Sequence, residues 1–168
     1  YSERLKAAES NDLNGVELFR FPSNINSSLE ITHWSYFENW DPYRNYLIAK
    51  EHCGLIENEG TNSGTFTNFA QNDQALYSLH TYLMYLKYGF GRANQDACID
   101  VRRGAMDRAQ AINLVRFYDG KYPEEFINLY LDYYKMSIEE FDNVLDKWAN
   151  KKLFTKINGK WVPNFEIK

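Results

Sequence analysis

The residues with the clearest potential for chemistry lie between Lys87 and Arg103, in the segment KYGFGRANQDACIDVRR. A helix-like run ends there in two glycines, and cations then crowd into a short stretch. Arginine guanidinium groups form paired hydrogen bonds with phosphate or carboxylate, so this grouping favours one compact anionic ligand. The candidate binding residues of this segment are Lys87, Arg92, Asp96, Arg102 and Arg103.

The alternative is an ordinary corner between helices whose charges pair locally. If residues 94–103 form a short helix, Asp96 and Asp100 share one face and Arg103 lies three positions after Asp100. Such pairs contribute only about 0.2–0.5 kcal/mol each. If Arg92 and Arg102 bind a ligand instead, replacing either with alanine should leave folding nearly intact and reduce catalytic efficiency.

A second candidate site is the loop GTFTNFAQND, residues 64–73, which is rich in hydroxyl and amide groups and runs into a helix. Backbone N–H groups at a helix N-terminus bind anions readily, so Thr65, Thr67 and Asn68 are candidate binding residues. The alternative is that Asn72 or Asp73 only caps the helix.

The three histidines are weaker candidates. His33 lies within the second expected strand, next to Trp34, and could act as a base, although a lone histidine there is more often packed. His80 falls on a leucine-rich helix face and is expected in the core, and His52 lies near a helix end, where a cation is favoured. The sequence contains neither an H-E-x-x-H nor a G-x-S-x-G motif, and we expect no metal site.

Composition narrows the class of protein. Among the 168 residues, 44% are apolar and 25% charged, and 17% are aromatic, which excludes simple disorder. The net charge of −4 argues against general nucleic-acid binding. Two distant cysteines and the lack of a long apolar run predict a cytoplasmic protein without a membrane span. The polar start at Tyr1 suggests a piece of a longer protein.

The elements expected to position these residues are mainly helical. Two leading strands are predicted at residues 16–21 and 29–37. Asp41-Pro42 predicts a helix start and Gly54 its end, and residues 55–70 read as a loop. A helix over 72–88 follows, with its apolar face at Leu76, Leu79, Leu83 and Leu86.

Capping patterns mark three further elements and a terminal hairpin. Asp107 with Gln110 begins a helix that Gly120 ends. Pro123 opens another helix, and Ser137 with Glu140 forms a capping box that begins the next. Asn158-Gly159 lies between two apolar runs, which predicts a β-hairpin. The helix after Pro123 carries Phe126, Leu129, Tyr130, Tyr133 and Tyr134 on one side.

Three segments resemble one enzyme family: EITHWSYFENWDPYRNYLIAKEHCGL, GTFTNFAQNDQALYSLHTYLMYLKYGFGRANQDACIDVRRGAM and AINLVRFYDGKYPEEF. They are similar to the C-terminal part of the N-acetyl sugar amidotransferases of surface-polysaccharide and sialic-acid-like sugar biosynthesis. The resemblance runs from about Glu30 to the end of the sequence. It implies conversion of a sugar acetamido group to an acetamidino group with ATP, Mg²⁺ and ammonia. It also implies a nucleotide-linked or free amino sugar substrate and a glutaminase-type partner that supplies the ammonia.

The resemblance also implies a division of the chain. Residues 1–40 would be the end of an α/β ATP-pyrophosphatase (PP-loop) domain, and residues 41–168 a helical C-terminal region. The S-G-G-x-D-S phosphate loop of the family is absent from this sequence. We therefore expect this chain alone to bind no ATP and to be inactive. In the whole enzyme, cations would stabilise the leaving phosphate and His33 is the candidate base.

Two other functions stay open. A helical interaction module could dock the glutaminase partner through an aromatic face. A carbohydrate-binding module could use the Trp and Tyr residues, but such modules are usually rich in β-structure. An S-G-G-x-D-S loop upstream in the same reading frame would favour the enzyme.

Overall fold

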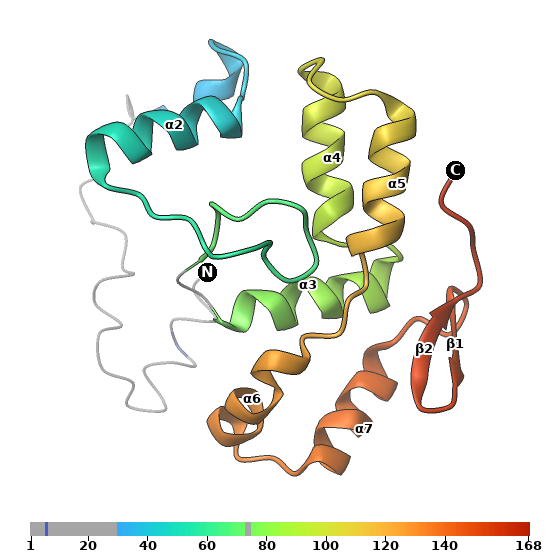
Figure 1. Cartoon of the computed structure of the whole chain (residues 1–168). Coiled ribbons are helices and arrows are strands. Elements are labelled where there is room, and N and C mark those ends of the chain that lie inside the picture. Colours follow the sequence, from blue (N-terminus) through green and yellow to red (C-terminus); the bar gives the residue numbers. More distant parts are fainter. Residues whose placement is uncertain (1–5, 7–29, 73–74) are drawn as a thin grey trace. The chain divides into compact units, whose positions relative to one another are not determined.

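The computed structural model describes residue 6, residues 30–72 and residues 75–168 (Figure 1). The chain divides into two compact units, residues 1–40 and residues 41–168. In the first unit, the described residues form one short 3-10 helix, η2 (Trp34–Tyr36). The assignment of residues 1–40 to an ATP-pyrophosphatase domain stays a prediction.

The second unit is mainly helical, as the sequence predicts. Its described residues form six α-helices, one 3-10 helix and one two-stranded sheet. In chain order these are α2 (Pro42–Cys53), α3 (Ala75–Tyr88), α4 (Arg92–Arg102), α5 (Arg108–Tyr118), η3 (Glu124–Phe126), α6 (Ile127–Tyr134), α7 (Ile138–Trp148), β1 (Phe154–Ile157) and β2 (Lys160–Pro163). No helix in the described part of the chain is long and apolar enough to cross a membrane.

Helix α2 begins and ends at the residues that the sequence predicts. The Asp41 carboxylate accepts a hydrogen bond from the Arg44 backbone N–H at 3.0 Å, and Pro42 occupies the first turn. Gly54 ends the helix in the left-handed region, with φ of 70°. The loop after it packs back on the helix, because the Phe69 ring stacks on buried Tyr46 with centroids 4.5 Å apart.

Helices α4 and α5 lie side by side (Figure 1). Asp107 and Gln110 form the predicted capping box at the start of α5, since each side chain bonds the other's backbone N–H. Gly91 precedes α4, and Gly89 has φ of 82°, so the two glycines do turn the chain between α3 and α4. The helix expected over residues 94–103 is therefore confirmed, with an earlier start.

The core lies where α3, α6, α7 and β1 meet. Leu86, Tyr130 and Phe154 are at most 1% exposed, and Phe141 and Leu145 of α7 pack with them. The Tyr130 hydroxyl donates a hydrogen bond to the Ala75 carbonyl at 2.6 Å, which satisfies the one polar atom of this buried side chain.

The C-terminal hairpin is also confirmed. Strands β1 and β2 pair antiparallel, with Ile157 opposite Lys160. Asn158 and Gly159 both have positive φ, 49° and 80°, which is the backbone of a type I′ turn. Residue Phe154 of β1 is buried and anchors the hairpin on the core.

Some predicted elements and faces differ from the structure. The strand predicted at 29–37 is wrong over residues 30–37, where η2 forms instead, and the strand at 16–21 lies outside the described residues. His80 is exposed rather than in the core. On α6 only Tyr130 is fully buried, and the exposed side chains include Leu129, Tyr133 and Tyr134.

Candidate functional site

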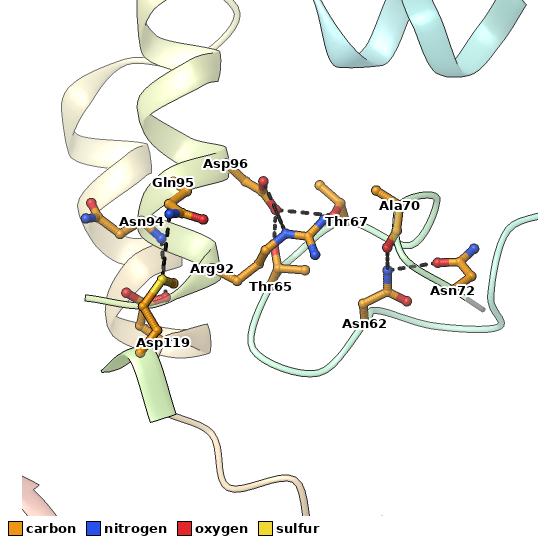
Figure 2. A network of polar contacts seen from close by, with 11 residues as sticks. Asn62, Thr65, Thr67, Ala70, Asn72, Arg92, Asn94, Gln95, Asp96 and Asp119 are labelled. Carbon is orange, nitrogen blue, oxygen red and sulfur yellow. Dashed lines mark hydrogen bonds and ion pairs between the residues drawn. The ribbon is translucent and has the colours of Figure 1, made fainter. Parts of the chain in front are cut away.

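Asp96 is the centre of a buried polar cluster that joins the loop after α2 to helix α4. The Thr65 hydroxyl donates to Asp96 Oδ2 at 2.6 Å, and the Thr67 hydroxyl lies 3.4 Å from the same oxygen. Arg92 Nε donates to Asp96 Oδ2 at 3.1 Å. Figure 2 shows the three side chains converging on this carboxylate. The structure thus brings together four of the predicted site residues.

The Arg92 side chain is held in one orientation. It is only 8% exposed, and its guanidinium carbon lies 4.7 Å from the centre of the Tyr77 ring. The contact is a cation–π interaction, which adds to the ion pair with Asp96. Arg92→Ala would remove both contacts, so the expectation that this change leaves folding nearly intact does not fit the burial.

The two terminal nitrogens of the Arg92 guanidinium make no hydrogen bond with a described residue. Only Nε bonds a described residue, through Asp96. In the described part of the chain, Trp161 Nε1 is the one fully buried side-chain nitrogen or oxygen without a partner. The Arg92 terminal nitrogens therefore keep some contact with solvent. A guanidinium fixed at Nε and open at its two terminal nitrogens can bind a phosphate or carboxylate in paired fashion.

The N-terminus of α4 itself is not an open anion site. Asp119, at the end of α5, accepts hydrogen bonds from the backbone N–H groups of Gly91 at 2.8 Å and Asn94 at 3.3 Å. The N–H of Ala93 donates to the Gly64 carbonyl at 3.0 Å. These contacts use the backbone donors of Gly91, Ala93 and Asn94, and the Asp119 carboxylate occupies the helix end, so the Arg92 side chain is the better candidate for an anion here.

Burial raises the pKa of Asp119 above its ordinary value, although the backbone donors of Gly91 and Asn94 act in the opposite direction. The charge of nearby Asp96 also raises it. Asp119 was not among the residues that the sequence indicated, because it lies 28 residues from Gly91 in the chain. In the sequence, Asp119-Gly120 indicates only that a helix ends there. Nothing in the pattern shows that Asp119 caps a different helix, α4.

The other arginines of the segment lie apart from Arg92. Arg103 is paired with Asp100 on the same helix at 2.8 Å and with Asp41, before α2, at 3.2 Å. The charge of Arg103 and, to a larger extent, the Arg44 backbone N–H lower the pKa of Asp41. Arg102 is exposed and makes no ion pair with a described residue. Arg102 lies ten residues after Arg92, about 15 Å along the helix axis, so one small anion cannot contact both from this chain.

The remaining candidates do not join the cluster. Lys87 lies at the end of α3, with its Nζ 5.3 Å from the centres of the Tyr88 and Trp148 rings. Asn68 donates to the Asn58 carbonyl at 3.2 Å and helps to close the loop. His33 is exposed, belongs to the other unit and makes no side-chain cap with η2. Within the described residues no group of His, Cys, Asp and Glu side chains could hold a metal ion.

The fold and the site define a helical domain that ends in a β-hairpin and presents one buried, oriented arginine. The sequence model of a family described as "LPS biosynthesis protein WbpG-like, C-terminal domain" matches residues 63–166, well over half of the chain. The chain belongs to this family of lipopolysaccharide biosynthesis proteins. The predicted kinship with surface-polysaccharide biosynthesis is thereby confirmed. A search of the curated proteins found none that matches the chain.

Proposed function

We propose that this chain is the C-terminal part of an ATP-dependent amidotransferase that converts a sugar acetamido group to an acetamidino group. The family match supports a place in lipopolysaccharide biosynthesis. The resemblance in sequence to N-acetyl sugar amidotransferases supports the reaction. In this proposal ATP activates the acetamido oxygen for displacement by ammonia from a glutaminase-type partner.

The observation that carries the proposal is that Arg92 is buried but bonds the protein through only one of its three guanidinium nitrogens. A buried arginine that served folding alone would be expected to use its whole guanidinium on protein partners. Arg92 instead bonds Asp96 through Nε and leaves both terminal nitrogens without a described partner. The paired oxygens of a phosphate on the nucleotide or on the sugar fit these two donors.

The residues around Arg92 have supporting roles. Thr65 and Thr67 donate to the same oxygen of Asp96 as Arg92 Nε, so they fix the carboxylate that orients the arginine. Tyr77 fixes the plane of the guanidinium. A preorganised donor of this kind stabilises negative charge that develops on a leaving phosphate without reorganising during the reaction.

In this proposal, binding of ATP and Mg²⁺ requires residues that this sequence does not contain. The residues around Arg92 fit a contact to one anionic group, whereas the sequence has no S-G-G-x-D-S loop. The nucleotide would therefore be bound mainly by an ATP-pyrophosphatase domain, and Arg92 would contribute one contact. His33 stays the candidate base of the predicted reaction.

The reaction can be tested with a protein that joins this region to an ATP-pyrophosphatase domain and with a nucleotide-linked N-acetyl sugar. With ammonium chloride and MgATP, mass spectrometry should detect replacement of the acetamido oxygen by NH. If the acetamido oxygen is isotopically labelled, the label should appear in phosphate or in AMP. ATP-independent conversion, or label released only as water, would refute the proposal.

A further inference from the structure

Helices α3 and α7 end beside each other, and the residues at these two ends form a surface that the amidotransferase proposal does not use. The Asn150 backbone N–H donates to the Leu86 carbonyl at 2.9 Å, and the Asn150 side-chain amide donates to the Lys87 carbonyl at 3.3 Å. These bonds hold residues 147–152 against residues 87–90. The two segments together are named the basic-aromatic surface, and none of the residues that bond Arg92 or Asp96 belongs to it.

The basic-aromatic surface carries four exposed lysines and no acidic residue: Lys87, Lys147, Lys151 and Lys152. None of the four makes an ion pair with a described residue, whereas four lysines elsewhere in the described part do. The neighbouring carboxylates have partners of their own, since Asp146 pairs with Lys156 at 2.6 Å and Glu166 with Lys168 at 3.4 Å. Four positive charges therefore lie together, without neutralising groups, in a chain whose net charge is −4.

Three exposed aromatic side chains lie among these lysines. Tyr88 is 56% exposed, Trp148 51% and Phe90 38%. The Nζ atom of Lys87 lies 5.3 Å from the centres of the Tyr88 and Trp148 rings, and that of Lys147 lies 5.7 Å from the Trp148 ring. The Tyr88 and Phe90 rings stack with their centres 6.1 Å apart. Large apolar groups that are exposed side by side mark an interaction surface.

A role in helix stability explains only part of this arrangement. Lysine in the last turn of a helix is favoured by the helix dipole, which accounts for Lys87 in α3 and Lys147 in α7. Lys151 and Lys152 follow the end of α7 and gain little from its dipole. The dipole also gives no reason for the exposed rings between the lysines.

The chemistry of the surface distinguishes among anionic partners. Protein interfaces are depleted in lysine and enriched in arginine, and this surface contains no arginine. Nucleic-acid bases stack on open ring faces, whereas two ammonium groups lie over the Trp148 ring and Tyr88 stacks with Phe90. In the headgroup layer of a bilayer, by contrast, tryptophan and tyrosine rings are enriched, and lysine stems lie along apolar groups while their ammonium groups reach the lipid phosphates.

We propose that the basic-aromatic surface binds the headgroup layer of a membrane that contains anionic lipid. The four ammonium groups would contact lipid phosphates, and the exposed rings would enter the boundary between headgroups and acyl chains. Such binding is peripheral and uses no membrane-spanning helix. The inference goes beyond the proposed reaction and needs neither ATP nor Arg92, so the failure of one would leave the other intact.

Cosedimentation of the full chain with lipid vesicles tests this proposal. One set of vesicles is phosphatidylcholine alone, and the other contains about 30% phosphatidylglycerol to supply negative charge. Binding is measured in about 50 mM and about 500 mM NaCl, because salt screens contacts between lysine and phosphate. A single-stranded oligonucleotide and polyglutamate, as alternative anionic partners, are tested by fluorescence anisotropy.

Two variants of the surface are compared with one control. The surface variants are Trp148→Ala and the double variant Lys151→Gln with Lys152→Gln. The control is Lys135→Gln with Lys168→Gln, which removes the same number of charges from two lysines outside the surface that are 79% and 81% exposed. Circular dichroism and urea melts identify the variants that are folded.

The wild type should bind the anionic vesicles at least about 10-fold more tightly than the neutral ones, and less tightly at the higher salt concentration. The double lysine variant should lose about 10-fold or more, because each lysine near an anionic surface contributes roughly 5-fold. Trp148→Ala should also bind more weakly, and the control should bind like the wild type. The proposal is overturned if the wild type does not prefer anionic vesicles, if a folded surface variant binds like the wild type, if the control loses as much as the double lysine variant, or if only the oligonucleotide or polyglutamate binds.

Discussion

Of the three arginines between Lys87 and Arg103, only Arg92 is both buried and without hydrogen bonds to the described residues at its terminal nitrogens. Arg103 is paired with two carboxylates, and Arg102 is exposed at the far end of α4. Arg92 is buried and oriented by Asp96, yet open at its terminal nitrogens. Residue types and spacing identified the group of arginines but could not rank them, because the ranking depends on Thr65 and Tyr77 from other elements.

The raised pKa of Asp119 should be detectable in the pH dependence of the free energy of unfolding. Because burial raises its pKa in the folded protein above 3.8, the folded state binds this proton more tightly than the unfolded state. Its contribution to the free energy of unfolding is thus present below about pH 3.8 and is lost as the pH rises through the folded pKa. In Asp119→Asn this dependence is absent.

Urea melts of both proteins between about pH 3.5 and 6.5 measure the effect. The free energy of unfolding of the wild type, taken relative to Asp119→Asn, should fall as the pH rises. A relative stability that rises with pH, or stays level, would show that the backbone donors of Gly91 and Asn94 outweigh the burial.

At the scale of elements, helix ends were predictable and helix faces were less so. Caps are local, so Asp41, Asp107 and Ser137 could be read directly from the sequence, as could the Asn158-Gly159 turn. The buried face of a helix depends on its neighbours. On α3 the leucine pattern predicted burial of Leu76, whereas tyrosines 82 and 85 are buried and Leu76 is 38% exposed.

Two leucines of α3 should therefore differ in their effect on stability. Leu86 is 1% exposed and lies in the core, so Leu86→Ala should lower the free energy of unfolding by about 2–5 kcal/mol. Leu76→Ala, on the same helix, should cost less than about 1 kcal/mol. Leu83, expected from the sequence to be fully buried, only packs at the edge of the core and should lie between the two.

Urea denaturation of the three variants at a fixed pH gives the comparison. Equal losses for Leu76 and Leu86 would mean that the two leucines share one buried face, as the sequence pattern alone suggests.

For the whole molecule, the sequence predicted a mainly helical unit with a terminal hairpin and a kinship that the family match confirms. The strand expected over residues 30–37 failed because β-branched and aromatic residues favour a strand only where neighbouring strands pair with it. The long-range contacts of the site, such as Thr65 with Asp96, could not be predicted because 31 residues separate the partners.

The central claim is that the open guanidinium of Arg92 binds an anionic group during turnover, and Arg92→Lys tests it most directly. Lysine keeps the charge near Asp96 but lacks the paired terminal donors. Arg103→Lys is the matched control, since Arg103 is also paired with carboxylates but lies outside the cluster. Melting temperature and kcat/KM are measured for both variants in the protein that carries the ATP-pyrophosphatase domain.

In the folded variant, Arg92→Lys should reduce kcat/KM by about 10- to 100-fold, equivalent to about 1.5–3 kcal/mol. Its melting temperature should fall further than that of Arg103→Lys, because Arg92 is more buried and lies on the Tyr77 ring. Arg103→Lys should leave kcat/KM unchanged. If Arg92→Lys lowers the melting temperature but the folded variant keeps the wild-type kcat/KM, Arg92 is a structural residue at a corner between helices and the account is wrong.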